Sequence, residues 1–412
     1  MAGRKAKKVN LSEDLRCFEN PYLSDAACNH PGAAVGKLSA ELVARLEHNI
    51  AANIAAIDDN CLSQSTRDHT VYTGTAGIAL LHYHLALTVY KSDPLPQLEI
   101  AERLLESALA ALDDRRYTFL CGASGPLAIA ALVHHKLQHA SLSGQYIAAL
   151  QDLYSKAKPS LSDHPSELLY GHAGLLYSML LVNKTLPGSF EDAVIADLVE
   201  AILSSGLLGK EEAFNCPMMF TWHHRHYLGA AHGLAGILTL LLQVPVERIQ
   251  PRIHSLVKPC VDFLLSVRYP SGNLPSSLES SNHDVLVHWC HGAPGAVHLF
   301  GLAYKVFGDE VYLKAALDCG EVVWRRGLLR KGYGLCHGVA GNAYTFIQLF
   351  KVTGDKHHLE RVIKFTEWCL TASERATPDT LFSLFEGLAG TTLFYCDVLT
   401  SLHSAVFPTL EL

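Results

Sequence analysis

The sequence lacks a long unbroken apolar run and lacks a strong excess of positive charge. The most apolar stretch, residues 227–246, contains His232, three glycines, Gln243 and Pro245, so we expect a buried helix after a glycine turn rather than a membrane span. The chain has 33 Lys and Arg against 40 Asp and Glu, a formal net charge of -7. Without a clustered cationic face, neither nucleic acid nor an anionic membrane is an expected partner.

The N-terminal residues lack two targeting signals. No apolar signal segment follows Met1, and residue 2 is alanine rather than the glycine that N-myristoylation requires. The one basic cluster, residues 3–8, predicts a flexible basic tail over 1–15 with at most peripheral membrane contact. The 11 cysteines are an odd number without a secretion signal, which indicates free thiols in a reducing compartment. We therefore expect a cytoplasmic protein, with partial membrane or nuclear association left open.

The remainder, residues 16–412, is predicted to form a single domain, because 49% of the chain is hydrophobic and 18% is charged. It contains a unit that occurs seven times: an aromatic, Cys, His or Glu residue, then Gly-x-x-Gly, then an apolar run. Successive copies begin 46 to 62 residues apart. The first glycines of the copies are Gly74, Gly122, Gly171, Gly233, Gly292, Gly338 and Gly387.

A spacing near fifty residues accommodates two helices and their connections. The run after each Gly-x-x-Gly is apolar on all sides, whereas intervening segments such as 42–57 and 101–114 are amphipathic. This contrast predicts an all-α, double-layered α/α-toroid of seven inner and seven outer helices, with every Gly-x-x-Gly turn at one end. The alternative is an open helical solenoid, which composition alone does not exclude.

Two of the turns contain the triplet Cys-His-Gly, at 290–292 and 336–338. If the turns converge, Cys290, Cys336 and His337 meet at one mouth and form a Cys-Cys-His set. Zinc prefers such donors, and three protein ligands leave a fourth position where an incoming thiol can be activated. The alternative is that these cysteines are buried packing residues, as we expect for Cys121 and for four helical ones: Cys260, Cys319, Cys369 and Cys396.

Two histidines at the same mouth are candidates for proton transfer. His291 lies between Cys290 and Gly292, and His232 occupies the equivalent place one copy earlier. A core histidine bonded to a carbonyl is the alternative for His232. The histidine-rich tract 223–226 is expected to be an exposed loop.

The motifs resemble those of the eukaryotic lanthionine synthetase C-like family. The resemblance extends from RCFENPY (16–22) to the C-terminus and includes YTGTAGIA, FLCGASGPLA, ELLYGHAG, YLGAAHGLAGI, LVHWCHGAPG, KGYGLCHGVAGNAY and PDTLFSLFEGLAGT.

The resemblance implies the α/α-toroid and one Zn²⁺ held by Cys290, Cys336 and His337. It also implies a zinc-dependent transferase that adds the thiol of glutathione, as co-substrate, to dehydroalanine or dehydrobutyrine residues of proteins, forming a thioether. Damaged kinases that have lost phosphate are the expected protein partners. His232 then handles the proton, and His291 stands where bacterial cyclases often have tyrosine.

Other positions are assigned by the same resemblance. Arg16 and Lys331 match basic residues that contact glutathione in the animal proteins of this family. The two carboxylates of glutathione are expected to bind near such cations. Glu167 stands where the cyclases have a functional aspartate, which leaves its role open. Ala123 replaces an aspartate of the animal proteins, a difference expected to alter the rim of the mouth.

Two other functions are compatible with the sequence. A non-catalytic zinc- and glutathione-binding adaptor in redox or kinase signalling would use the same residues without turnover. A carbohydrate-active α/α-barrel would need paired carboxylates at the rim, and Glu167 and Glu386 come from distant copies.

Overall fold

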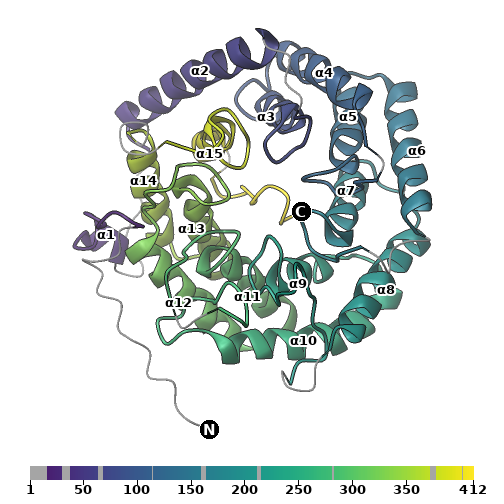
Figure 1. The fold of residues 1–412 in the computed structure, drawn as a ribbon. Helices are drawn as coiled ribbons and strands as arrows, with labels where there is room; N and C mark the ends of the chain where they lie inside the picture. Colours follow the sequence, from purple (N-terminus) through teal and green to yellow (C-terminus); the bar gives the residue numbers. More distant parts are fainter. Residues whose placement is uncertain are drawn as a thin grey trace.

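A computed structural model describes residues 16–29, 38–63, 68–113, 115–158, 164–210, 215–280, 283–371, 377–400 and 402–412. The predicted basic tail, 1–15, lies outside these residues. The described parts form helices and connecting turns arranged as a closed ring in two layers (Figure 1). In this part of the chain, no helix is both long and apolar enough to span a bilayer.

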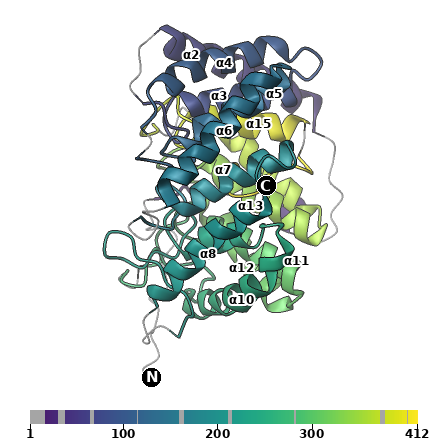
Figure 2. The same cartoon turned by 90° about the vertical axis from the view of Figure 1, so that its right-hand side faces the viewer.

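Inner and outer helices alternate along the chain, which confirms the predicted α/α-toroid. The outer helices α4 (Leu95–Ala110), α6 (Ala140–Ala157) and α8 (Asp192–Leu208) form part of the wall seen in Figure 2. A short helix α1 (Ala26–Asn29) and a 3₁₀ helix η4 (Glu247–Ile249) supplement the two layers. The inner helices are α3 (Thr75–Leu87), α5 (Ser124–Lys136), α7 (His172–Thr185), α9 (Leu234–Leu241), α11 (Ala293–Phe307), α13 (Val339–Thr353) and α15 (Leu388–Thr400). The outer helices are α2 (Ala40–Ser63), α4 (Leu95–Ala110), α6 (Ala140–Ala157), α8 (Asp192–Leu208), α10 (Gln250–Val267), α12 (Glu310–Arg326) and α14 (His357–Cys369).

The two layers differ in burial as their residue patterns predict. In α5, every residue from Ser124 to His134 is buried, because this inner helix has neighbours on all sides. In the outer helix α4, burial is confined to one stripe, formed by Leu98, Ala101, Leu104, Leu105 and Ala108. The apolar composition of each inner helix is therefore what allows it to stand between the outer layer and the axis.

The Gly-x-x-Gly motif is explained by a close approach of backbone to backbone. A Cβ on Gly125 would collide with the carbonyl oxygen of Phe119, six residues earlier, and a Cβ on Gly341 would collide with that of Leu335. The chain before each inner helix thus folds back against the first turn of that helix. Only glycine leaves room for this, so the motif recurs wherever an inner helix begins.

Hydrogen bonds join the seven turns into a continuous ring. The bond from Phe385 N to Tyr72 O, 3.1 Å long, connects the seventh turn to the first, so the chain is a closed toroid and not an open solenoid. The other links are Tyr72 N to Leu120 O (3.0 Å), Thr118 Oγ1 to Leu168 O (3.0 Å), Leu168 N to Ala231 O (3.2 Å), Ala231 N to Cys290 O (3.4 Å), Cys290 N to Cys336 O (3.4 Å) and Cys336 N to Phe385 O (2.7 Å).

The C-terminal segment 405–412 enters the middle of the ring (Figure 1). Phe407 is fully buried and its ring stacks on Trp289 with centroids 5.0 Å apart. Thr409 N donates to the hydroxyl of Tyr177 (3.1 Å), and Gln243 Nε2 donates to Leu410 O (2.8 Å). This segment, called the C-terminal plug below, fills the axis between inner helices from different repeats.

Candidate functional site

Cys290, Cys336 and His337 lie together, as the sequence predicts. The hydrogen bond between the fifth and sixth turns sets the two cysteines side by side, and one donor atom from each of the three residues lies within 4.8 Å of the others. All three residues are buried. Burial first, and then the Cys290 thiol, raise the pKa of Cys336 well above its ordinary value, so two thiolates here require a compensating cation. Two sulfurs and one imidazole nitrogen fit zinc.

Asp379 also belongs to this cluster, although the sequence reasoning assigned it no role. Its Oδ2 lies 3.4 Å from His337 Nε2 and 3.0 Å from Lys331 Nζ. The hydrogen bond from Lys331 lowers the pKa of the Asp379 carboxyl, which therefore remains ionised. A metal-binding histidine commonly donates its second N–H to a carboxylate, and Asp379 is placed to receive it. The only local signal was its position shortly before the last Gly-x-x-Gly.

Arg16 and Lys331, which are 315 positions apart in the sequence, are brought to the same side of the mouth. Residues 16–18 pair with 328–330, through Phe18 N to Leu328 O (2.7 Å) and Arg330 N to Arg16 O (2.9 Å). Both cations act on one half-buried histidine: burial first, and then the charges of His337, Lys331 and Arg16, lower the pKa of His288 to about 3. This side of the mouth thus presents two cations, one of them paired with the Asp379 carboxylate, beside the Cys-Cys-His cluster.

His232 lies on the neighbouring turn and is held by Glu167. Its Nδ1 is 2.7 Å from Glu167 Oε2, and the Glu167 side chain is only 2% exposed. The same carboxylate accepts hydrogen bonds from the backbone N–H groups of Leu169 and Tyr170, which fix its position. The partner of His232 is thus a carboxylate rather than a carbonyl, and the ring is 21% exposed. Its other nitrogen, Nε2, is left for a reacting group.

His291 faces His232 across the space between the fourth and fifth turns. The two ring centroids are 6.2 Å apart, and the ring of Tyr227 lies 5.7 Å from each of them. Burial first, and His232 second, lower the pKa of His291 to about 4. The structure therefore brings both predicted proton-transfer residues together at the mouth.

Aromatic side chains surround His232 on the side away from the cysteines. The ring of Tyr170 is parallel to that of His232 at 6.2 Å, and Trp222 stacks on Tyr170 at 5.7 Å. Trp222 and Arg225 pair through two backbone hydrogen bonds of 2.9 and 3.0 Å, which makes His223 and His224 the tip of a tight exposed turn. Both tip residues have positive φ, 48° and 59°, a conformation that histidine tolerates better than most residues. The tract 223–226 thus lies in an exposed loop.

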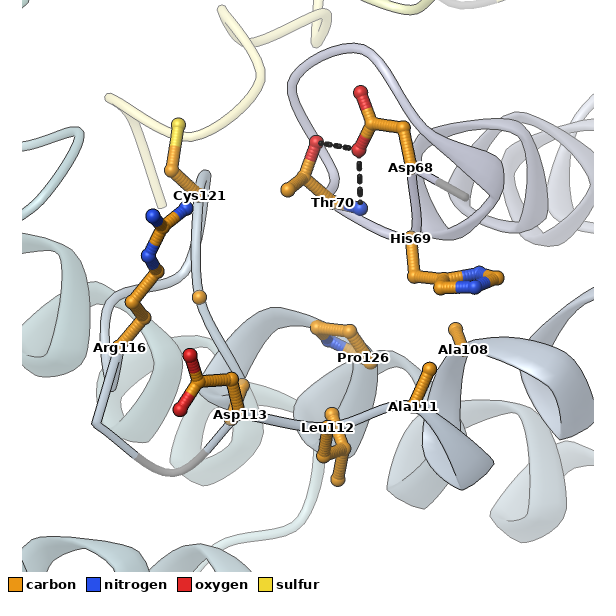
Figure 3. Close-up of a pocket in the computed structure, with 12 residues that line it drawn as sticks. Asp68, His69, Thr70, Ala108, Ala111, Leu112, Asp113, Arg116, Cys121 and Pro126 are labelled. Carbon is orange, nitrogen blue, oxygen red and sulfur yellow. Dashed lines mark hydrogen bonds between the residues drawn. The ribbon is translucent and has the colours of Figure 1, made fainter. Parts of the chain in front are cut away.

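A pocket of about 500 Å³ opens between the first and second turns (Figure 3). Arg116 extends toward Cys121 on one wall, and on the other Asp68 accepts hydrogen bonds from Thr70 N (2.9 Å) and Thr70 Oγ1 (2.8 Å). Burial first, and Glu167 second, raise the pKa of Cys121 to about 12, which suits a packing thiol. Ala123 lines this pocket, so the replaced aspartate would have stood here.

Three comparisons with known proteins identify the relatives of this chain. A family model described as "Lanthionine synthetase C-like protein" matches residues 65–412. The chain is 42% identical over 407 residues to "Glutathione S-transferase LANCL1" from Danio rerio, covering 97% of this chain and 99% of that protein.

Among solved structures, nisin cyclase superposes with a TM-score of 0.68 at 16% identity, covering 85% of this chain and 93% of that one, a likeness that shows the fold alone. The toroid and its glycine turns agree with a family match over most of the sequence, and the chain belongs to the lanthionine synthetase C-like family.

Proposed function

We propose that this chain is a zinc-dependent glutathione transferase that adds the glutathione thiol to dehydroalanine and dehydrobutyrine residues of proteins. The name of the Danio rerio relative supports a glutathione-related transferase. The observation that carries the proposal is that a Cys-Cys-His donor set and a carboxylate-held histidine lie on adjacent turns of one mouth. Such a pair supplies what conjugate addition needs, an activated thiol and a proton donor.

Glutathione fits the side of the mouth that holds Lys331. The peptide carries two carboxylates and one ammonium group, and this side presents the cations Arg16 and Lys331 together with the carboxylate of Asp379. Zinc held by Cys290, Cys336 and His337 would lower the pKa of the incoming thiol so that it reacts as a thiolate. Asp379 orients His337 and also pairs with Lys331, so it links the zinc-binding residues to a cation that contacts the bound glutathione.

The addition forms one C–S bond and one C–H bond. The sulfur attacks the β-carbon of the dehydrated residue, the double-bond electrons move toward the α-carbon and its carbonyl, and the α-carbon then takes a proton. We assign the donation of this proton to His232 Nε2, because Glu167 holds Nδ1 and stabilises the imidazolium. His291, with its ring 6.2 Å away, is the second candidate donor.

The polypeptide substrate is proposed to approach from the second, third and fourth turns. The thiol occupies the side formed by the fifth and sixth turns, so the acceptor must enter from elsewhere. The exposed face of Tyr170, the ring of Trp222 and the pocket beside Arg116 offer contacts for an extended chain on this side. Proteins that have lost phosphate from serine or threonine, such as damaged kinases, are the proposed source of the dehydrated residue.

A dehydroalanine peptide incubated with glutathione and the zinc-loaded protein tests the proposal. We expect mass spectrometry to show the thioether adduct with the wild-type chain and little adduct with His232→Ala, although the zinc content of that variant is unchanged. Cys336→Ala should form no adduct and should hold one zinc ion fewer than the wild type. His48→Ala, at an exposed position on the outer helix α2, is the matched histidine control and should retain activity. The adaptor alternative predicts that the wild-type protein binds glutathione and zinc but forms no adduct, and that result would refute the transferase.

A further inference from the structure

A second group of metal-binding side chains lies far from the mouth. Glu102 belongs to the outer helix α4, His134 to the last turn of the inner helix α5, and His139 is the residue before the outer helix α6. Since α5 begins at the mouth, at Ser124, the rise of an α-helix places His134 about 15 Å along the barrel toward the opposite end. This group, the α4–α5–α6 cluster, therefore shares no residue with the site described above.

The donor atoms of the cluster form a triangle with nearly equal sides. His134 Nδ1 lies 3.4 Å from His139 Nδ1 and 3.5 Å from Glu102 Oε1, and His139 Nδ1 lies 3.8 Å from the same oxygen. Around a tetrahedral zinc with bonds near 2.0 to 2.1 Å, two donors are separated by about 3.3 Å. The three donor–donor distances are thus close to the edge lengths of one face of a zinc tetrahedron. A shift of the side chains by a few tenths of an ångström would bring all three donor atoms to bonding distance from one ion.

The backbone holds two of these ligands in place. Gln138 adopts a left-handed conformation (φ 63°), and the chain turns back so that His139 N donates to His134 O over 2.8 Å. The ring of His134 is stacked on Tyr146 with centroids 5.2 Å apart, and its side chain is 6% exposed. A left-handed glutamine costs conformational energy that an ordinary helix end with glycine would avoid. The turn thus places the two imidazoles side by side.

We propose that the α4–α5–α6 cluster binds a second divalent metal ion, Zn²⁺, through Glu102, His134 and His139. Two imidazoles and a carboxylate are borderline and hard donors that zinc accepts. His139 is 48% exposed and Glu102 30% exposed, so water can occupy the remaining coordination position. The ion would tie an inner helix to the outer helices on both sides of it. Its role is structural, and it is independent of the thiol chemistry at the mouth.

Zinc stoichiometry tests this site. Full-length protein is saturated with Zn²⁺, dialysed against metal-free buffer and analysed by elemental mass spectrometry. We expect two zinc ions per chain for the wild type and one each for His139→Ala, Glu102→Gln and Cys336→Ala. His135→Ala, the matched control on the same helix, should keep two. Adding Zn²⁺ should raise the melting temperature of Cys336→Ala, and the double variant Cys336→Ala/His139→Ala should lose this rise.

The outcomes distinguish the two sites. One zinc in the wild type, unchanged in His139→Ala and Glu102→Gln, would overturn the second site and leave the proposed transferase untouched. One zinc in the wild type and in Cys336→Ala, with none in His139→Ala, would instead support the second site and contradict the Cys-Cys-His centre. Cobalt gives an independent readout, because Co²⁺ bound by nitrogen and oxygen lacks the thiolate charge-transfer band of a cysteine site.

Discussion

At the scale of single residues, Glu167 shows how a carboxylate can set the chemistry of a neighbouring histidine. It is buried and anchored by two backbone N–H groups, and it contacts one nitrogen of His232. This arrangement fixes both the orientation and the tautomer of the ring. Glu167 does not reach a substrate itself, so it is a positioning residue.

Replacing Glu167 by glutamine should lower the rate of adduct formation about 10- to 100-fold while the KM for glutathione and the zinc content stay near their wild-type values. The amide keeps the shape of the side chain but no longer stabilises a charged imidazolium. Asp58, on the outer helix α2 and 3.0 Å from His82 Nε2, supplies a matched carboxylate–histidine control, and Asp58→Asn should retain activity. Equal losses in both variants would contradict the assignment.

At the scale of structural elements, the start of each inner helix is a rigid unit of turn and helix. The loop before α5 packs so closely on the first turn of that helix that the Cβ of any residue other than glycine at position 125 has no space. Gly144, in the next helix α6, has no atom within 4 Å of the position where a Cβ would be. The same residue type therefore has opposite structural consequences in two neighbouring helices.

Gly125→Ala should lower the free energy of unfolding by about 2 kcal/mol or more, because backbone must move to admit the methyl group. Gly144→Ala should raise it by about 0.5 to 1 kcal/mol, because alanine is the better helix former. Urea unfolding followed by circular dichroism measures both changes. A neutral Gly125→Ala would mean that the turn relaxes freely, and the steric explanation of the motif would then be wrong.

The outer helix α14 contains a buried histidine that makes stability depend on pH. Burial first, and His357 second, lower the pKa of His358 to about 3. The unfolded chain takes up this proton near pH 6.5, whereas the folded chain does so only near pH 3, so stability falls as the pH drops from about 6.5 toward 3.

His358→Phe removes this dependence. At pH 5 the wild type should lose up to about 2 kcal/mol more than the variant, relative to their values at pH 7. Urea unfolding of both proteins at pH 7, 6 and 5 measures the difference, and the values at pH 7 serve as the internal reference. Parallel pH profiles would show that His358 titrates normally in the folded protein.

At the scale of the whole molecule, the C-terminal plug links the axis of the ring to the site. Phe407 stacks on Trp289, which directly precedes Cys290, and it contacts the edge of Tyr344 at 5.4 Å. Glu411 anchors the plug further: burial alone would raise its pKa, but His298 and Lys351 outweigh this effect and lower it to about 2. The carboxylate is therefore ionised and paired under ordinary conditions.

Truncating the plug residue by Phe407→Ala should cost about 3 to 5 kcal/mol of stability, because it leaves a cavity among aromatic rings. Leu208→Ala, at a side chain that is 86% exposed, should change stability by less than about 0.5 kcal/mol. Thermal unfolding measures both, and zinc content at low temperature should fall in Phe407→Ala if the support of Trp289 matters. A loss similar to that of Leu208→Ala would contradict the plug.

The fold was predictable because each Gly-x-x-Gly marks a place where the preceding loop packs against the first turn of an inner helix, and the sequence repeats this motif seven times. The meeting of Cys290, Cys336 and His337 followed from the same repeat, since equivalent turns lie at one end. Asp379 could not be found in this way, because its contacts with Lys331 and His337 depend on the spatial neighbourhood of two different turns.

The plug and the contact of Glu167 with His232 also escaped the sequence reasoning. The plug follows the last copy of the repeat, so the spacing of the repeats could not predict where it lies. Glu167 was singled out, yet its partner is 65 residues away on the next turn. Whether the predicted site residues bind zinc and glutathione stays a prediction for the experiments above.

The bond that joins the seventh turn to the first has a consequence for biosynthesis. The partner of Tyr72 O is Phe385 N, so the hairpin of the first turn has no neighbour on one flank until residue 385, which is 313 positions later, has been translated. Such distant pairing makes folding slow, and nascent intermediates expose apolar edges to chaperones and to aggregation. A circular permutant with new termini in an outer loop would keep the same neighbouring hairpins in the folded ring but would change which hairpin lacks its neighbour until the end of synthesis. Its refolding rate would reveal which hairpin forms first and nucleates the others.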